Sequence, residues 1–155
     1  MRVWHWRNDV FVRSLIVLSL APVVAVLLAN GASTALAASD GQFNAPGNIL
    51  ISDQFNNRAI EIDPHTKHIV WSFGSGNPAL CNPGPGAIIG LNDAERLSDG
   101  LTLLAGTGIP AGASASLPNG CVDNRVIVVN QHGRIVWQYG QAGVTGAGPN
   151  ELNTP

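Results

Sequence analysis

The histidines are the first residues in this sequence that could do chemistry. His65 and His132 lie in equivalent polar turns, where they could act as metal ligands, and His68 follows the first of these turns. A metal site in a protein needs three or four convergent ligands, whereas a histidine in a polar turn usually serves only solubility. The sequence therefore favours an ordinary surface role for these histidines and predicts no metal site.

An acidic residue precedes an Asn-Arg dipeptide at two places in the chain. The residues concerned are Asp53, Asn57 and Arg58 in the first place and Asp123, Asn124 and Arg125 in the second. Such carboxylates and guanidinium groups could perform acid–base catalysis or bind an anion. The alternative is an Asx-turn with an arginine–carboxylate pair that locks a hairpin. Because the pattern recurs, and catalytic groups usually break such a symmetry, the structural role is favoured.

Trp71 and Trp137 could form a stacking platform for a flat cofactor or a glycan. Both occupy the same place in an Ile-Val-Trp-x-aromatic-Gly motif, which favours packing between neighbouring structural units. The glycines never complete the G-x-G-x-x-G pattern of a phosphate-binding loop, and no G-x-S-x-G nucleophile motif occurs. The sequence thus predicts no catalytic residue and no cofactor.

The composition excludes several classes of protein. The chain has 155 residues, a formal net charge of −2, 12% charged residues and 45% hydrophobic residues. A nearly neutral chain without a basic run lacks the electrostatic footprint of a nucleic-acid-binding protein, and the apolar fraction is too high for a disordered tail. The class that the composition leaves is a single loop-rich globular unit.

The N-terminal segment has the pattern of an export signal. Three arginines in residues 1–13 precede an apolar run at 14–29, and small residues then end in Ala35-Leu36-Ala37. This is the order of a secretory signal peptide with its cleavage site, which predicts a hydrophobic signal helix removed with residues 1–37. The alternative is an uncleaved membrane anchor over residues 14–38. Either alternative predicts a secreted or extracytoplasmic protein, held at the cell surface if the segment is retained.

The two cysteines follow this signal segment. Cys81 and Cys121 lie in the part of the chain that is exported, where disulfides persist. Two cysteines allow one intramolecular pairing, so a Cys81–Cys121 disulfide is predicted. Both cysteines are flanked by prolines and glycines, and we expect them in irregular segments rather than on strands.

An internal repeat determines the expected fold. Residues 57–74 and 124–140 share Asn-Arg, a β-rich run, a polar turn and the tryptophan motif. Apolar and polar residues alternate in the tryptophan-bearing segments, which is the period of a strand. Each copy is therefore expected to be a hairpin, with strands at 59–62, 69–73, 126–129 and 135–139.

Further strands are expected upstream in both copies, at 47–51 and 100–104. The second copy then reads as a four-stranded antiparallel meander, with strands at about 93–97, 101–105, 125–130 and 134–139. A loop insertion is expected at 107–122, and no helix longer than two turns is expected after Ser39.

These motifs resemble those of β-propeller repeats. Residues 53–58 are similar to the D-x-x-N-N-R signature of NHL repeats, residues 63–71 and 130–137 resemble PQQ-like repeats, and residues 94–103 resemble arylsulfotransferase-like repeats. The resemblance implies an all-β fold of four-stranded antiparallel blades. With about two blades visible, it also implies an incomplete propeller and an N-terminal fragment of a longer one.

The expected organisation follows from this resemblance. Blade 1 covers about 41–74, a linker covers 75–92, blade 2 covers about 93–140, and 141–155 leads into a further blade. The expected function is a binding or scaffold module for a protein, glycan or small-molecule ligand. Open blade edges would also permit self-association. The alternative is a piece of a propeller enzyme of the arylsulfotransferase-like, quinone-dependent dehydrogenase-like or NHL-type lyase kind.

Overall fold

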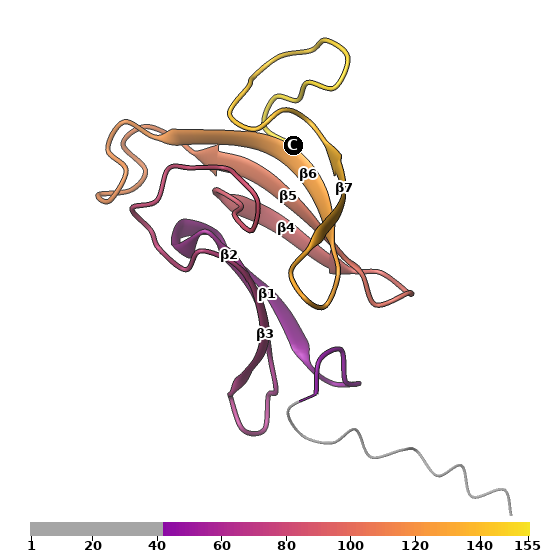
Figure 1. Cartoon of the computed structure of the whole chain (residues 1–155). Helices are drawn as coiled ribbons and strands as arrows, with labels where there is room; N and C mark the ends of the chain where they lie inside the picture. The colour runs from indigo at the N-terminus through magenta and orange to yellow at the C-terminus, as the bar shows by residue number, and fades with distance from the viewer. Residues whose placement is uncertain (1–41) are drawn as a thin grey trace, which may run out of the picture. The chain divides into compact units, whose positions relative to one another are not determined.

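The computed structural model describes residues 42–155, and this part of the chain is all-β. Its strands form two antiparallel sheets, with the orders β1-β2-β3 and β4-β5-β6-β7 (Figure 1). The first sheet consists of β1 (Ile49–Asp53), β2 (Arg58–Ile62) and β3 (Ile69–Gly74). The second consists of β4 (Leu91–Arg96), β5 (Thr102–Ile109), β6 (Cys121–Val129) and β7 (Ile135–Tyr139). The all-β prediction is therefore confirmed.

The first sheet buries one of its two faces. Ala59 is paired with Phe73, and Glu61 with Trp71, so that these side chains share a face. All of them are buried, whereas Ser72 between them is exposed. The period-two pattern of the sequence thus sets the orientation of β3.

The second sheet is the four-stranded meander that the sequence predicts. Its face toward the first sheet is formed by Leu104, Ile127, Val129 and their neighbours, and these three side chains have no exposed surface. The core shared by the two sheets includes Ala59, Trp71, Phe73, Ile88, Leu91, Leu104, Ile127 and Val129. A face of each sheet is therefore removed from water by the other.

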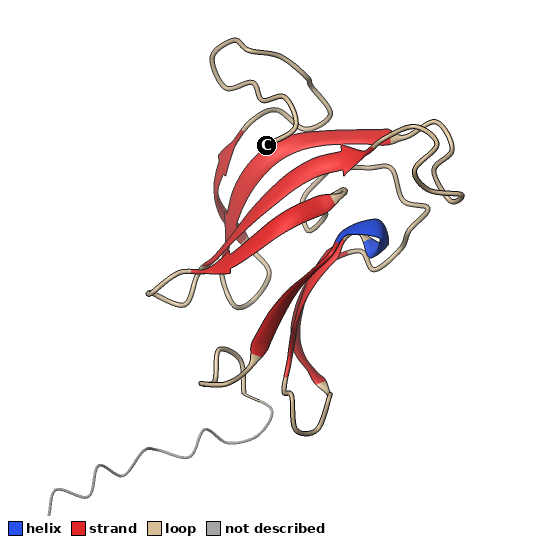
Figure 2. Ribbon diagram, turned by 180° about the vertical axis from the view of Figure 1, so that it is seen from behind, coloured by secondary structure: helices blue, strands red, loops and turns tan. Residues whose placement is uncertain are grey.

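Helical structure in residues 42–155 amounts to one short turn, the 3-10 helix η1 (Gln54–Asn56) between β1 and β2 (Figure 2). No helix within this range has the length and hydrophobicity of a membrane span. The predicted signal peptide or anchor, residues 1–37, lies outside the residues that the structure describes.

Two expectations about the strands are corrected. The four-stranded repeat is incomplete in the described residues, because the first sheet has three strands and residues 42–47 form turns before β1. The insertion is also shorter than residues 107–122, since β5 continues to Ile109 and pairs it with Cys121 at the start of β6. The register shifts between Gly106 and Gly108, where Asp123 and Asn124 of β6 lie opposite the single residue Thr107, and the two strands continue past this β-bulge. Cys121 therefore lies on a strand, contrary to prediction, whereas Cys81 lies in a loop.

Candidate functional site

The repeated asparagines hold the loops that leave each sheet. Asn57 is fully buried and adopts a left-handed backbone conformation, with φ of 54°. Its amide nitrogen donates to the carbonyl oxygens of Asn77 (3.1 Å) and Leu80 (3.2 Å), and its amide oxygen accepts from the backbone nitrogen of Gly90 at 3.0 Å. One side chain thus fixes both ends of the segment that joins β3 to β4.

Asn124 makes the same set of contacts in the second sheet. Its φ is 56°, and its amide nitrogen donates to the carbonyl oxygen of Val144 (3.3 Å) and the hydroxyl of Thr145 (2.7 Å). Its amide oxygen accepts from the backbone nitrogen of Thr154 at 3.0 Å. Residues 141–155 are therefore held against β6 as the loop 75–90 is held against β2.

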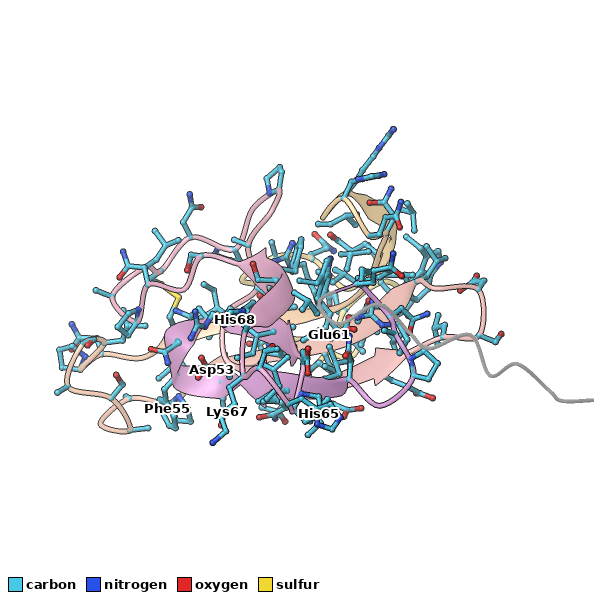
Figure 3. The ribbon with its side chains drawn as sticks, turned by 90° about the horizontal axis from the view of Figure 1, so that it is seen from below. Asp53, Phe55, Glu61, His65, Lys67 and His68 are labelled. Carbon is cyan, nitrogen blue, oxygen red and sulfur yellow. A yellow bond between two sulfur atoms is a disulfide. The ribbon has the colours of Figure 1, made fainter. Side chains whose placement is uncertain are left out.

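The two aspartate–arginine pairs differ in burial. Arg58 Nε donates to Asp53 Oδ2 at 2.7 Å, and both side chains are partly exposed (Figure 3 labels Asp53). Arg125 and Asp123 are almost fully buried, and Arg125 donates to both carboxylate oxygens of Asp123. This second pair also binds the incoming loop, because Arg125 donates to the carbonyl of Ala87 at 2.9 Å and the backbone nitrogen of Ile89 donates to Asp123 at 2.6 Å.

A partly buried cluster of charged and aromatic groups joins the two sheets. The guanidinium of Arg96 on β4 lies 4.1 Å from the ring centroid of Phe43 and 4.9 Å from that of Trp71, and it is ion-paired with Glu61 on β2. Desolvation by burial lowers the pKa of Arg96, and the charge of Glu61 opposes that shift. The indole nitrogen of Trp71 donates to the carbonyl of Gln131 at 3.0 Å. These groups bind one another, so the cluster is a junction between sheets.

The sequence analysis missed Glu61, Arg96 and Phe43. One signal was present: Glu61 stands where the second copy of the repeat has Val128, so a charge interrupts the apolar period of a strand. A buried charge in such a place requires a partner. The partner, 35 positions along the chain, has no counterpart in the repeat motif.

Within residues 42–155, no strand covers the outer face of the second sheet. The C-terminal segment reaches its edge, where the backbone nitrogen of Asn150 donates to the Tyr139 hydroxyl at 3.2 Å. By register, Trp137 shares this face with Val128, and Tyr139 shares it with Val126. Trp137 is 51% exposed, although its equivalent Trp71 is 7% exposed. Leu103 and Ala105 on β5 continue the face, and Asp93 and Glu95 on β4 form its charged margin.

In the part of the chain that the structure describes, no strand covers the outer face of the first sheet either. Ile49, Ile51, Ile60 and Ile62 occupy it on β1 and β2. A register shift between Glu61 and Ile62 interrupts the alternation of β3 and pairs Ile69 with Ile62 on this face. Of these, Ile49 is 47% exposed and Ile69 is 50% exposed. The described residues thus carry two apolar faces without a neighbour, one on each side of the pair of sheets.

The structure contains the disulfide that the sequence predicts. Cys81 and Cys121 are bonded, with 5.6 Å between their Cα atoms. The bond joins the loop between the sheets to the start of β6, where Cys121 packs with Ile89, Ile109 and Leu117. A disulfide is compatible with an extracytoplasmic location.

The turn histidines lie at the equivalent turns predicted for them. The backbone nitrogen of His65 donates to Asp63 Oδ1 at 2.8 Å, and that of His132 donates to Asn130 Oδ1 at 3.0 Å (Figure 3 labels His65). No group of three His, Cys, Asp or Glu side chains that could hold a metal ion occurs in the part of the chain that the structure describes.

A surface hollow of about 340 Å³ lies beside His132. Its lining residues are Phe43, Asp99, Gly100, Leu101, Asn130, Gln131 and His132. The polar groups here serve the turns themselves, since Asn130 accepts from two backbone nitrogens and Asp99 accepts from that of Leu101. The open sheet faces therefore remain the better candidates for binding.

The chain matches no protein-family model and no curated protein. Its resemblance to NHL and PQQ-like repeats stays a prediction from the motifs quoted above.

Proposed function

We propose that this protein is an exported binding or scaffold module built from propeller-type β repeats, with the Trp137 face as its principal interaction surface. The single observation that carries the proposal is the contrast between Trp71 and Trp137. These residues stand at equivalent positions, but one is 7% exposed and the other 51%. A half-exposed tryptophan in a continuous apolar face is the kind of surface that proteins bury against partners.

The repeated polar residues support a role without catalysis. The side-chain amides of Asn57 and Asn124 form hydrogen bonds that hold loops. Asp123 and Arg125 bind each other and the segment 87–89. These groups stabilise the fold through their hydrogen bonds. Binding specificity is therefore expected from the sheet faces and the loops. The enzyme alternative stays a prediction from the resemblance alone.

A location outside the cytoplasm fits this proposal. The signal pattern of residues 1–37 predicts export, and the disulfide between Cys81 and Cys121 is compatible with an oxidising compartment. Among partner classes, the aliphatic side chains of Leu103, Val126 and Val128 beside the two rings favour a protein over a glycan or a small molecule.

The test is a photo-crosslink from position 137 in the producing cells. A photoreactive phenylalanine analogue at Trp137 is expected to give a covalent adduct of discrete mass. The matched control carries the analogue at Phe55, which is 46% exposed but belongs to η1 rather than to a sheet face. Adducts at neither position, or equal adducts at both, would contradict a specific interaction surface at Trp137.

A further inference from the structure

The two open faces correspond to the two sheet faces that already pack against each other in this structure. We call that packed contact between the first and second sheets the junction. In that junction the Trp71 face of the first sheet covers Thr102, Leu104, Ile127 and Val129, which are fully buried. The strand registers align these four residues with Ile49, Ile51, Ile60 and Ile62 of the first sheet. The isoleucine face is therefore the counterpart of the covered face, but nothing in residues 42–155 covers it.

The other half is the outer face of the second sheet. The same registers align Trp137, Tyr139, Val126 and Val128 with Trp71, Phe73, Ala59 and Glu61. Each chain thus presents two complementary faces that are not in contact, one on its second sheet and the other on its first. The halves face away from each other, so they cannot meet within one copy.

We propose that copies of this chain associate head to tail, with the Trp137 face of one copy seated on the isoleucine face of the next. The proposal rests on the interaction surface assigned above and names its partner. Contact between two different surface patches makes the interface heterologous, which closes into a ring or extends as a filament.

As the partner of the Trp137 face, the charges favour the three-stranded first sheet of a second copy over a four-stranded sheet of another protein. In the existing junction Glu61 pairs with Arg96, which is contributed by β4. The first sheet has three strands and no counterpart of β4, so the isoleucine face brings no arginine at that place. The Trp137 face correspondingly has Val128 where Glu61 stands. The central parts of the two open faces therefore meet without burying an unpaired charge, which is costly in a protein interior. Asp93 and Glu95 stay at the exposed margin on β4.

The indole nitrogen of Trp137 also has a corresponding acceptor. Trp71 donates to the carbonyl of Gln131, the residue after Asn130 in the β6–β7 turn. Asn130 corresponds to Asp63 in the first repeat, so the matching acceptor is the carbonyl of Pro64 in the β2–β3 turn of the next copy. A hydrogen bond at the end of a buried tryptophan completes the apolar contact.

Sedimentation of the full chain with its disulfide formed, in a mild detergent, tests the proposal. The expected result is a species of two or more copies. Trp137→Glu blocks one half of the junction and Ile49→Glu blocks the other, and each is expected to weaken association at least about tenfold. Phe55→Glu adds the same charge away from both faces and should associate like the wild type. The apolar N-terminal segment is common to all variants and cannot produce a difference between them.

An equimolar mixture of the two blocked variants gives the decisive result. Each retains the half that the other has lost, so the mixture should form a one-to-one dimer although each variant alone is a monomer. Persistence of a dimer in either variant alone would show a symmetric contact and overturn the proposal, as would a monomeric wild type. Trp137→Ser and Ile49→Ser provide a second pair if a charged variant does not fold.

The crosslink from position 137 separates this proposal from the proposed function. An adduct with a second copy of the chain supports both. An adduct with a different protein supports the interaction surface and overturns head-to-tail association, and the absence of any adduct overturns both.

Discussion

The carboxylate of Glu61 pairs with the guanidinium of Arg96 across the two sheets, and this guanidinium lies over the adjacent rings of Phe43 and Trp71. Glu61 also accepts from the backbone nitrogen of Asn44 at 2.7 Å and from the side-chain amide of Asn48 at 2.6 Å. This one carboxylate therefore connects the second sheet to the turns that precede β1.

Glu61→Ala is expected to destabilise the fold by about 3–5 kcal/mol, because it leaves the charge of Arg96 without its partner. The double variant Glu61→Leu with Arg96→Met removes both charges and keeps apolar atoms against the aromatic rings. It should recover part of the lost free energy of unfolding, because the hydrogen bonds from Asn44 and Asn48 to Glu61 remain lost. Urea unfolding of both variants measures this, and a double variant no more stable than Glu61→Ala would contradict it.

Asn57 is expected to be sensitive to substitution for two separable reasons. Asn57→Ala removes three hydrogen bonds and places a side chain in the left-handed region, at a combined cost of about 2–4 kcal/mol. Asn57→Gly loses the same bonds but adopts this φ without strain, so it should be more stable than the alanine variant by about 1 kcal/mol. Thermal unfolding of the pair tests this order, which equal stabilities would contradict.

Acid stability is expected to depend on Asp63 in the β2–β3 turn. The hydrogen bond from the backbone nitrogen of His65 is the largest effect and lowers the pKa of Asp63 from 3.8, against the opposing effect of burial. A carboxyl whose pKa is lower in the folded state stabilises that state above the unfolded pKa. The stabilisation is lost as the pH falls through the folded value.

Asp63→Asn should remove this dependence while keeping the turn, because Asn130 likewise accepts from two backbone nitrogens in the corresponding turn of the second repeat. Between pH 7 and pH 3, the melting temperature of the wild type is expected to fall more than that of Asp63→Asn. Parallel curves for the two proteins would contradict the assignment.

Much of the fold could be predicted from the sequence because the alternation of apolar residues is local. The Trp71 and Trp137 strands follow directly from this period, as does the four-stranded second sheet. The continuation of β5 and β6 into the expected insertion could not be predicted, because it depends on a β-bulge in β6 opposite the segment between Gly106 and Gly108. Glycines in this segment indicate a loop as readily as a bulge.

The roles of the repeated residues were harder to predict from the sequence. The recurrence of Asn57 and Asn124 indicated a structural role. Their hydrogen-bond partners lie 20 to 33 positions away, in loops without a common sequence pattern. The different exposures of Trp71 and Trp137 were likewise invisible to a repeat motif. They depend on which sheet lies against each face.

That difference gives a prediction about the two tryptophans. Trp71→Ala should cost about 3–5 kcal/mol, since it removes a buried ring from the core between the sheets. Trp137→Ala should cost less than about 1 kcal/mol at a protein concentration low enough to prevent association. Denaturant unfolding measures both values, and comparable losses would show that Trp137 is buried in the single chain.

The disulfide is expected to contribute most of its stabilisation by restricting the unfolded chain. Cys81 and Cys121 are separated by 40 positions, and a loop of that length corresponds to about 4 kcal/mol in the chain-entropy model. The double variant Cys81→Ser with Cys121→Ser should therefore unfold at a lower urea concentration than the oxidised wild type. Dithiothreitol should shift the wild type toward the double variant and leave the double variant unchanged. Equal midpoints for the oxidised wild type and the double variant would show that the hydrogen bonds of Asn57, Asp123 and Arg125 suffice to hold the loop.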